Sequence, residues 1–357
     1  NCSFSTSPST MPTEFIYTFG LAFIVAAIGL FLLWPAAIEY GLVDHPDQRK
    51  QHKGETPLIG GACIFLGIWS TLLVPGVDSP SNLYIYLVIL LLTGIADDYL
   101  ELSIGLRVCV QLMVALAVCL ADNHLITYAG DIIGIGGIGT AFFATPITVL
   151  AIVTAVNAFN MIDGIDGLAA SLAITTFASL ALIFGIYGMH SELIICLAFL
   201  GALIPFLLAN LAVFPFRKAF LGDAGSILIG FCIVWLLIDG SQPPNRANPE
   251  SRAFYPVTAM WLVGVPLFDL MSVSVRRMMR GESPLKGNRD HIHHLLQKTG
   301  LSPGFCVLAC VALQLALILI GISFEIAQHE ALSFGVFWLA FAGYHLVTTR
   351  LSKRQSP

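Results

Sequence analysis

Long apolar segments constrain the fold of this chain more than any other feature of its sequence. Each is about 17–25 residues long, which is the length that an α-helix needs to cross about 30 Å of hydrocarbon. Hydrophobic residues make up 57% of the 357 residues and charged residues 11%, whereas soluble domains carry about 25% charged residues. We therefore predict an all-α polytopic membrane protein with about eleven transmembrane helices. The predicted helices are 14–38, 57–75, 82–98, 103–121, 140–160, 167–187, 191–213, 224–240, 254–275, 303–323 and 331–349.

A glycine-punctuated stretch rich in β-formers separates the fourth predicted helix from the fifth. Residues 124–138 are expected to form a small β-hairpin at the membrane surface. Because the low charge content extends along the whole sequence, no soluble domain is expected at either end. We expect a single transmembrane domain at 13–350, between an N-terminal tail of 1–12 and a C-terminal tail of 351–357.

Lysine and arginine residues are distributed unevenly between the predicted loops. Threading eleven helices through a membrane places all but Arg246 and Arg252 of the 17 basic residues on one side. Cytoplasmic loops carry an excess of basic residues, so the N-terminus is expected to be periplasmic and the C-terminus cytoplasmic. Arg276, Arg277 and Arg280 are expected to contact anionic lipid at the cytoplasmic surface.

Four polar clusters fall on the cytoplasmic side of this topology. A carboxylate at a membrane interface costs free energy unless it binds something, so clustered aspartates predict a functional site. Oxygen donors favour Mg²⁺, with Mn²⁺ as the alternative, and Mg²⁺ usually binds together with substrate phosphates. Nearby basic residues and histidines suit a diphosphate substrate. The clusters span 94–101, 157–167, 220–226 and 288–294, and their aspartates include Asp97, Asp98, Asp163, Asp166 and Asp223.

Asp223 is the first candidate for a magnesium ligand, and Asn160 is the second. The flanking Gly222 and Gly225 allow the backbone to approach a ligand closely. The structural alternative for Asp223 is the N-cap of the eighth predicted helix. The two roles are compatible, because a helix N-terminus also attracts phosphate.

The four clusters together resemble the signature motifs of the polyprenyl-phosphate N-acetylhexosamine-1-phosphate transferases, which are of the glycosyltransferase 4 type. The likeness extends from Gly41 to the last predicted helix and keeps the order of the motifs. Within that family the chain is most similar to the type that transfers GlcNAc-1-phosphate from UDP-GlcNAc to undecaprenyl phosphate and releases UMP. The matching motifs are Asp97-Asp98, Asn157 to Gly167, Leu221 to Ser226 and His291 to His294.

This resemblance implies a setting as well as a reaction. The reaction is the first membrane step in making O-antigen lipopolysaccharide and related cell-envelope polysaccharides. It takes place at the bacterial inner membrane, with the active site facing the cytoplasm and Mg²⁺ as cofactor. Membrane lipids and often a second copy of the chain, in a homodimer, are the implied partners, and no nucleic acid is expected.

The resemblance also implies roles for single residues. Asp97 and Asp98 would engage the lipid phosphate or the metal, with Asp97 proposed as a base. A base is not obligatory, because a phosphate monoester is largely dianionic at neutral pH. The structural alternative is an ion pair between this aspartate pair and Arg107.

The nucleotide and its sugar have implied partners in the other clusters. Asp163 would lie at the catalytic centre, and Asp166 would lie near the uracil ring. Phe220 would stack on uracil, with a place in the interfacial aromatic belt as the alternative. Asn157 is either a substrate contact or a structural hydrogen-bonding residue.

The histidine motif is expected to contact the diphosphate and the sugar. His291 is assigned a catalytic role, and His293 and His294 are assigned to substrate binding. Three histidines could instead form a zinc site, but no further soft ligand lies nearby in the sequence. Lys53 and Arg289 are expected to bind the diphosphate. Asp269, near the inner end of the ninth predicted helix, is expected to pair with one of the arginines that follow it.

Two alternatives stay open. The nearer alternative is the same reaction with another UDP-N-acetylhexosamine, such as UDP-FucNAc. A membrane transporter is the more remote alternative, because its acidic residues would lie near the midplane in broken helices. The MurNAc-pentapeptide transferases of peptidoglycan synthesis usually have threonine where this chain has Ile162, so that activity is disfavoured.

Overall fold

A computed structural model describes residues 13–44, 55–75, 81–243, 252–283 and 290–354. All eleven predicted segments are helical within these ranges, so the predicted all-α membrane fold is confirmed. Nine described helices are long and apolar enough to cross a membrane. The helices are α1 (Thr13–Tyr40), α2 (Gly60–Ser70), α3 (Ser81–Leu100), α4 (Ile104–Ala121), α5 (Ala144–Ile162), α6 (Leu168–Tyr187), α7 (His190–Asn210), α8 (Gly222–Ser241), α9 (Pro256–Leu262), α10 (Gly264–Met279), α11 (Ile292–Lys298), α12 (Pro303–Ile326) and α13 (Glu330–Arg354), with 3₁₀ turns at Thr71–Leu73 and Ala141–Phe143.

The second predicted span is shorter than expected. The helical stretch is Gly60–Leu73, which at 1.5 Å per residue covers about 21 Å. Its first predicted residue, Pro57, is instead in a strand, because β2 (Thr56–Pro57) pairs antiparallel with β1 (Val43–Asp44). Sequence patterning did not predict this two-stranded sheet, since each strand has only two residues.

The ninth predicted span is broken into α9 and α10, which meet at an angle of 86°. Neighbouring helices take up the backbone groups that the break releases, as backbone within a membrane requires. Gln314 of α12 accepts from the Val265 N–H at 2.8 Å and donates to the Leu262 carbonyl at 2.7 Å. The hydroxyl of Thr176 in α6 also donates to the Leu262 carbonyl, at 3.0 Å. Side chains of α12 and α6 therefore stabilise the break between α9 and α10.

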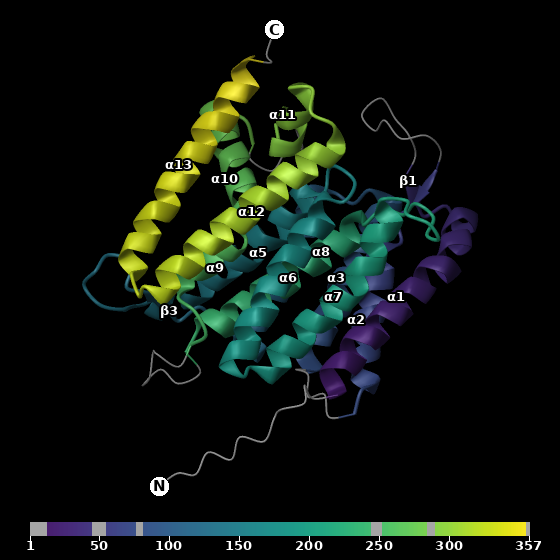
Figure 1. Ribbon diagram of the computed structural model, residues 1–357, viewed down its shortest axis with the longest axis horizontal. Helices are drawn as coiled ribbons and strands as arrows, with labels where there is room; N and C mark the ends of the chain where they lie inside the picture. The colour runs from purple at the N-terminus through teal and green to yellow at the C-terminus, as the bar shows by residue number, and fades with distance from the viewer. Residues whose placement is uncertain (1–12, 45–54, 76–80, 244–251, 284–289, 355–357) are drawn as a thin grey trace.

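The predicted hairpin is present as β3 (Tyr128–Gly130) paired antiparallel with β4 (Ile138–Gly139). Side chains at the end of α8 and the start of α13 hold it. Gln242 accepts from the Tyr128 N–H at 2.9 Å, and Glu330 accepts from the Asp131 N–H at 2.8 Å. In Figure 1 the hairpin strand β3 lies at the end of the bundle opposite to α11.

Helix α8 lies at the centre of the bundle, packed against α2, α3 and α5 (Figure 1). Almost all of its length is buried, which fits its nearly continuous apolar sequence. Two glycines allow its first turn to lie against its neighbours. A Cβ at Gly94 of α3 would overlap the backbone of Ala224, and a Cβ at Gly61 of α2 would overlap the backbone of Gly225.

We expect Gly94→Ala to destabilise the protein, because the added methyl group meets backbone that cannot rotate away. Overpacking of this kind costs about 1–3 kcal/mol. Thermal unfolding in detergent, followed by size-exclusion fluorescence, measures the effect. Gly20→Ala in α1 is the matched control, since a Cβ there meets nothing within 4 Å. Equal melting temperatures for the two variants would contradict the close packing of α3 on α8.

Candidate active site

The first turn of α8 is held by a carboxylate of α3. Asp98 accepts from the backbone N–H of Asp223 at 2.7 Å and from that of Ala224 at 3.3 Å. These are N–H groups that the helix itself leaves without partners. The N-cap residue is Leu221, so the alternative in which Asp223 is the N-cap is wrong. Asp98 of α3 instead accepts the hydrogen bonds that an N-cap side chain would accept. Gly222 is left-handed here, with φ of 71°.

Asp97 and Asp223 share one cation, which is the guanidinium of Arg107. Its Nη1 atom lies 2.7 Å from an oxygen of Asp97 and 3.1 Å from an oxygen of Asp223. The other oxygen of Asp223 accepts from the Asn160 amide at 2.6 Å. Asp97 is buried, whereas the Asp223 side chain is 33% exposed. The expected ion pair with Arg107 is therefore present, and it extends to the candidate metal ligand.

Asp163 ends α5 at the edge of this carboxylate group. Its side chain reaches solvent. Even so, the surrounding protein and the negative charges of Asp223, Asp98 and Asp166 raise the pKa of its carboxyl to about 8. Mutual repulsion among carboxylates is relieved when a cation binds between them.

Asp166 and Phe220, which the resemblance assigns to the uracil ring, meet at one lysine. Lys218 Nζ lies 2.6 Å from a carboxylate oxygen of Asp166 and 5.2 Å from the centre of the Phe220 ring. The ammonium group of Lys218 is thus within reach of both a carboxylate and an aromatic ring.

The histidines lie against the loop that begins at Asp163. A Cβ at Gly164 would overlap the ring of His293, whose own ring centre lies 5.9 Å from that of His291 and 4.2 Å from that of His294. His293 is 1% exposed, and neither of its ring nitrogens has a hydrogen-bond partner among the residues that the structure describes. Because a buried polar atom without a partner costs about 1–3 kcal/mol, His293 is a candidate for a ligand contact.

His291 pairs with Asp269, which corrects the expectation that this aspartate pairs with an arginine. The His291 Nδ1 atom lies 2.7 Å from Asp269, and both side chains are buried. Arg276 and Arg277 are also buried, so their expected contact with lipid headgroups is wrong. Arg276 donates instead to the backbone carbonyl of Asp290 at 2.6 Å.

The remaining predicted residues divide into two groups. Asn157 donates to Gln111 of α4 and to the Val153 carbonyl of its own helix, both at 2.8 Å. These contacts are those of a structural hydrogen-bonding residue. Lys53 and Arg289 lie outside the described residues.

The oxygen atoms of the side chains in this site are of the type that binds a hard divalent cation. Four carboxylates and one amide gather around the start of α8, and such oxygen atoms are what Mg²⁺ prefers. Within the described ranges no three acidic or histidine side chains surround one point as a preformed metal cage. Mg²⁺ does not need such a cage, since it is usually bound by one or two carboxylates, water and substrate phosphates. Asp223 and the neighbouring Asn160, the two candidate ligands, would hold it together with Asp97, which shares Arg107 with Asp223.

Burial lowers the pKa of His293 to about 3, with a further contribution from neighbouring His294. The folded protein therefore resists protonation of this ring as the pH falls below the ordinary value of about 6.5, while the unfolded chain does not. We expect stability to fall with pH between about 6.5 and 3. His293→Gln should lose less of its melting temperature than the unchanged protein when the pH drops from 7.5 to 5. Exposed His329, changed to glutamine, is the control, and equal losses in all three proteins would contradict the buried neutral ring.

Sequence reasoning missed three residues of this site. The sequence suggests Arg107 as a partner of the aspartate pair in α3 but does not connect it with Asp223, and it assigns no partner to Lys218. Tyr344 donates to Asp269 at 3.1 Å from α13, far away in the sequence. A basic residue or a tyrosine hydroxyl inside an apolar segment is a signal that it has a polar partner, but the sequence does not identify that partner.

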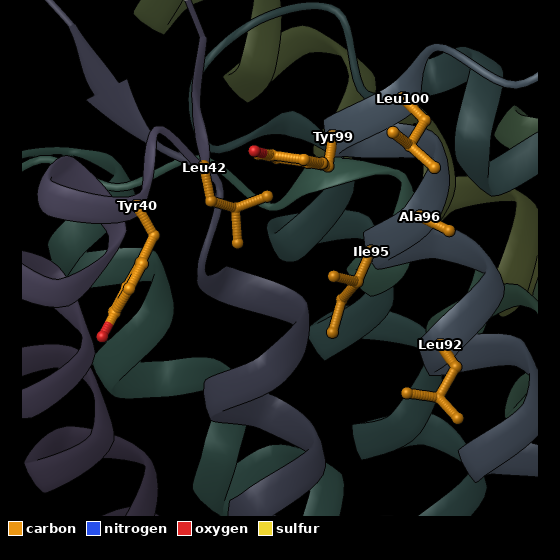
Figure 2. A pocket seen from close by; sticks show the side chains of 7 residues that line it. All are labelled: Tyr40, Leu42, Leu92, Ile95, Ala96, Tyr99 and Leu100. Atoms are coloured by element: carbon orange, nitrogen blue, oxygen red, sulfur yellow. The ribbon is translucent and has the colours of Figure 1, made fainter.

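An apolar pocket of about 430 Å³ lies between the end of α1 and the end of α3. Figure 2 shows its lining, which comes from the end of α1 with the residues after it and from the last two turns of α3, with Tyr99 directed toward Leu42. Asp97 and Asp98 belong to the same two turns of α3. The lining residues are Tyr40, Leu42, Leu92, Ile95, Ala96, Tyr99 and Leu100.

Comparison with known proteins places this bundle and its carboxylates in a family. The family model of glycosyl transferase family 4 matches residues 81–241, which include α3 to α8 and the aspartates around them. Proteins named undecaprenyl-phosphate alpha-N-acetylglucosaminyl 1-phosphate transferase are similar over most of their length. The one from Yersinia pestis is 35% identical over 87% of this chain and 83% of its own, and the one from Escherichia coli K12 is 34% identical over 90% and 88%. The one from Haemophilus influenzae is 34% identical over 92% of both chains. The chain belongs to glycosyl transferase family 4.

Proposed function

We propose that this protein transfers GlcNAc-1-phosphate from UDP-GlcNAc to undecaprenyl phosphate, giving undecaprenyl-diphospho-GlcNAc and UMP. The observation that carries the proposal is the convergence of Asp97, Asp98, Asp163 and Asp223 at the start of α8. The names of the relatives, which are similar over most of the chain, support the choice of acceptor and sugar.

In this proposal a phosphate oxygen of undecaprenyl phosphate attacks the β-phosphorus of UDP-GlcNAc. The bond from that phosphorus to the bridging oxygen breaks, and UMP leaves with the electron pair. Since the acceptor is largely dianionic at neutral pH, the main tasks of the protein are positioning and charge stabilisation. Bound Mg²⁺ would neutralise charge on the diphosphate. Arg107, freed from Asp223, would meet a phosphate oxygen.

The two substrates are assigned to different groups of residues around the carboxylates. Asp166, Lys218 and Phe220 offer a carboxylate, an ammonium group and an aromatic face to the uridine end. His291 and His293 are assigned to the diphosphate and the sugar, because their segment packs on the loop that follows Asp163. The apolar pocket on α3 suits the first isoprene units of a lipid whose phosphate lies beside Asp97.

The proposal includes a place in the cell. The protein would be in the bacterial inner membrane with the start of α8 facing the cytoplasm, where UDP-sugars are found. It would act in O-antigen or related polysaccharide synthesis, among membrane lipids and as a homodimer. Light scattering of the purified protein in detergent tests the last point.

One assay tests the reaction. Membranes containing the protein receive UDP-[³H]GlcNAc, undecaprenyl phosphate and Mg²⁺, and the organic phase is counted while UMP is measured. We expect equal amounts of labelled lipid and UMP, and loss of both when the metal is chelated. Parallel reactions with other UDP-N-acetylhexosamines identify the preferred sugar. If no UDP-N-acetylhexosamine gives a labelled lipid with release of UMP, the proposal is wrong.

A further inference from the structure

One face of α10 holds the segment that begins the histidine motif. Asp269, Arg276 and Arg280 are spaced by seven and then four residues, so they lie on the same face of the helix. Arg276 donates to the Asp290 carbonyl at 2.6 Å, and Arg280 donates to the Asp290 carboxylate at 2.8 Å. Asp269 contacts the next two residues of the chain, His291 and Ile292. The helix thus fixes this segment at three successive residues.

The contacts of Asp269 are specific to its ionised form. One carboxylate oxygen accepts from the Ile292 N–H at 2.8 Å and from the Tyr344 hydroxyl at 3.1 Å. The other oxygen lies 2.7 Å from His291 Nδ1. Because an ionised carboxylate only accepts hydrogen bonds, the hydrogen between them belongs to His291 Nδ1. Asp269 is 1% exposed, so water does not compete for these contacts.

We propose that Asp269 is a positioning residue for the transfer reaction, which sets the orientation and the tautomer of His291. With Nδ1 committed to Asp269, Nε2 on the opposite edge of the ring is the nitrogen that meets the diphosphate. The inference rests on the proposed function, because it names what holds one of its site residues. Tyr344 supports the carboxylate from α13, so the last helix also contributes to the site.

An asparagine at position 269 tests this assignment sharply. The Ile292 backbone N–H can only donate, so the amide oxygen of the asparagine must stay on that side. Its NH₂ group then faces His291 Nδ1, which can accept that bond only without a hydrogen of its own. The hydrogen moves to Nε2, and the nitrogen that faces the substrate can no longer take up a proton. Size and shape are almost unchanged.

We expect Asp269→Asn to lower kcat for transfer by about 10- to 100-fold, with the KM for UDP-GlcNAc changed by less than about threefold. The double variant Asp269→Asn, His291→Gln should be no slower than His291→Gln alone, because Asp269 acts through that ring. Tyr344→Phe, which keeps the charge, should give a smaller loss that also disappears when His291 is glutamine. The melting temperature of each variant is measured in the same preparations.

The matched control is Asp239→Asn, which changes the aspartate of another Asp–His pair, with His124 at 3.5 Å. We expect that variant to keep its activity. Three outcomes overturn the inference: Asp269→Asn with normal kcat, losses that multiply in the double variant, or a Tyr344→Phe loss that persists without His291. If Asp269→Asn does not fold, the Tyr344→Phe pair decides alone. Absence of transfer by the unchanged protein would instead contradict the proposed function.

Discussion

Asp223→Asn loses GlcNAc-1-phosphate transfer by about 10³-fold or more, and added Mg²⁺ does not restore it. The carboxylate of Asp223 lies where Asn160, Arg107 and the first turn of α8 meet, and it is partly exposed to solvent. Charge stabilisation by a bound metal is worth several kcal/mol, and each 1.36 kcal/mol is tenfold in rate. Asp223→Ala should be equally inactive, which shows that the charge and not the volume is needed.

Asp239→Asn is the matched control for this prediction, because it removes a second carboxylate from the same helix. The two aspartates are sixteen residues apart, which is about 24 Å along α8. Initial rates are measured across a range of Mg²⁺ concentrations, and folding is checked by melting temperature. Near-normal transfer by a folded Asp223→Asn protein would remove this residue from the metal site.

The membrane spans were predictable because each one satisfies its own backbone hydrogen bonds, so local sequence is enough. The break between α9 and α10 was not, since it depends on Gln314 and Thr176, which lie in other helices. Because Val263, the residue at the break, is as apolar as its neighbours, the hydropathy pattern predicts one continuous span. A break of this kind becomes visible only when the partners of the released backbone groups are in place.

The sequence predicts which carboxylates belong to the candidate site, but it does not predict which side chains pair with them. Asp97, Asp98, Asp163 and Asp223 stand out because acidic residues at a membrane interface are expensive. Asp269 carries the same signal, but three arginines closer in sequence concealed its pairing with His291. Arg276 and Arg280 bind Asp290 instead, and the partner of Arg276 is a backbone carbonyl, which has no signature in the sequence.

The structure also changes what the aspartate pair in α3 is expected to do. The resemblance gives Asp97 and Asp98 a shared role at the lipid phosphate or the metal, with Asp97 as the proposed base, but the structure gives them different contacts. Asp98 accepts two backbone N–H groups and fixes the start of α8, whereas Asp97 shares Arg107 with Asp223. Asp98 therefore has a structural task that does not depend on substrate, and Asp97 has a cation that a substrate can displace.

Arg107→Met lowers kcat by about 10²- to 10³-fold, which is the usual loss when one preorganised group that stabilises transition-state charge is removed. The same variant needs less Mg²⁺ for half-maximal activity. A single atom, Arg107 Nη1, contacts both Asp97 and Asp223. It therefore competes with a divalent cation for these oxygens while the substrate is absent. Removing it leaves the carboxylates more negative, so they attract the cation more strongly.

Two variants separate this effect from a general loss of positive charge. Arg107→Lys keeps one charge within reach of both carboxylates and should be faster than Arg107→Met. Arg217→Met removes an exposed charge at the same end of the bundle, where Arg217 stacks on Trp34 at 4.7 Å, and should leave both kcat and the Mg²⁺ requirement unchanged. The measurement is a Mg²⁺ titration of initial rate for all four proteins. A higher Mg²⁺ requirement in Arg107→Met would mean that this arginine helps to hold the metal and does not compete with it.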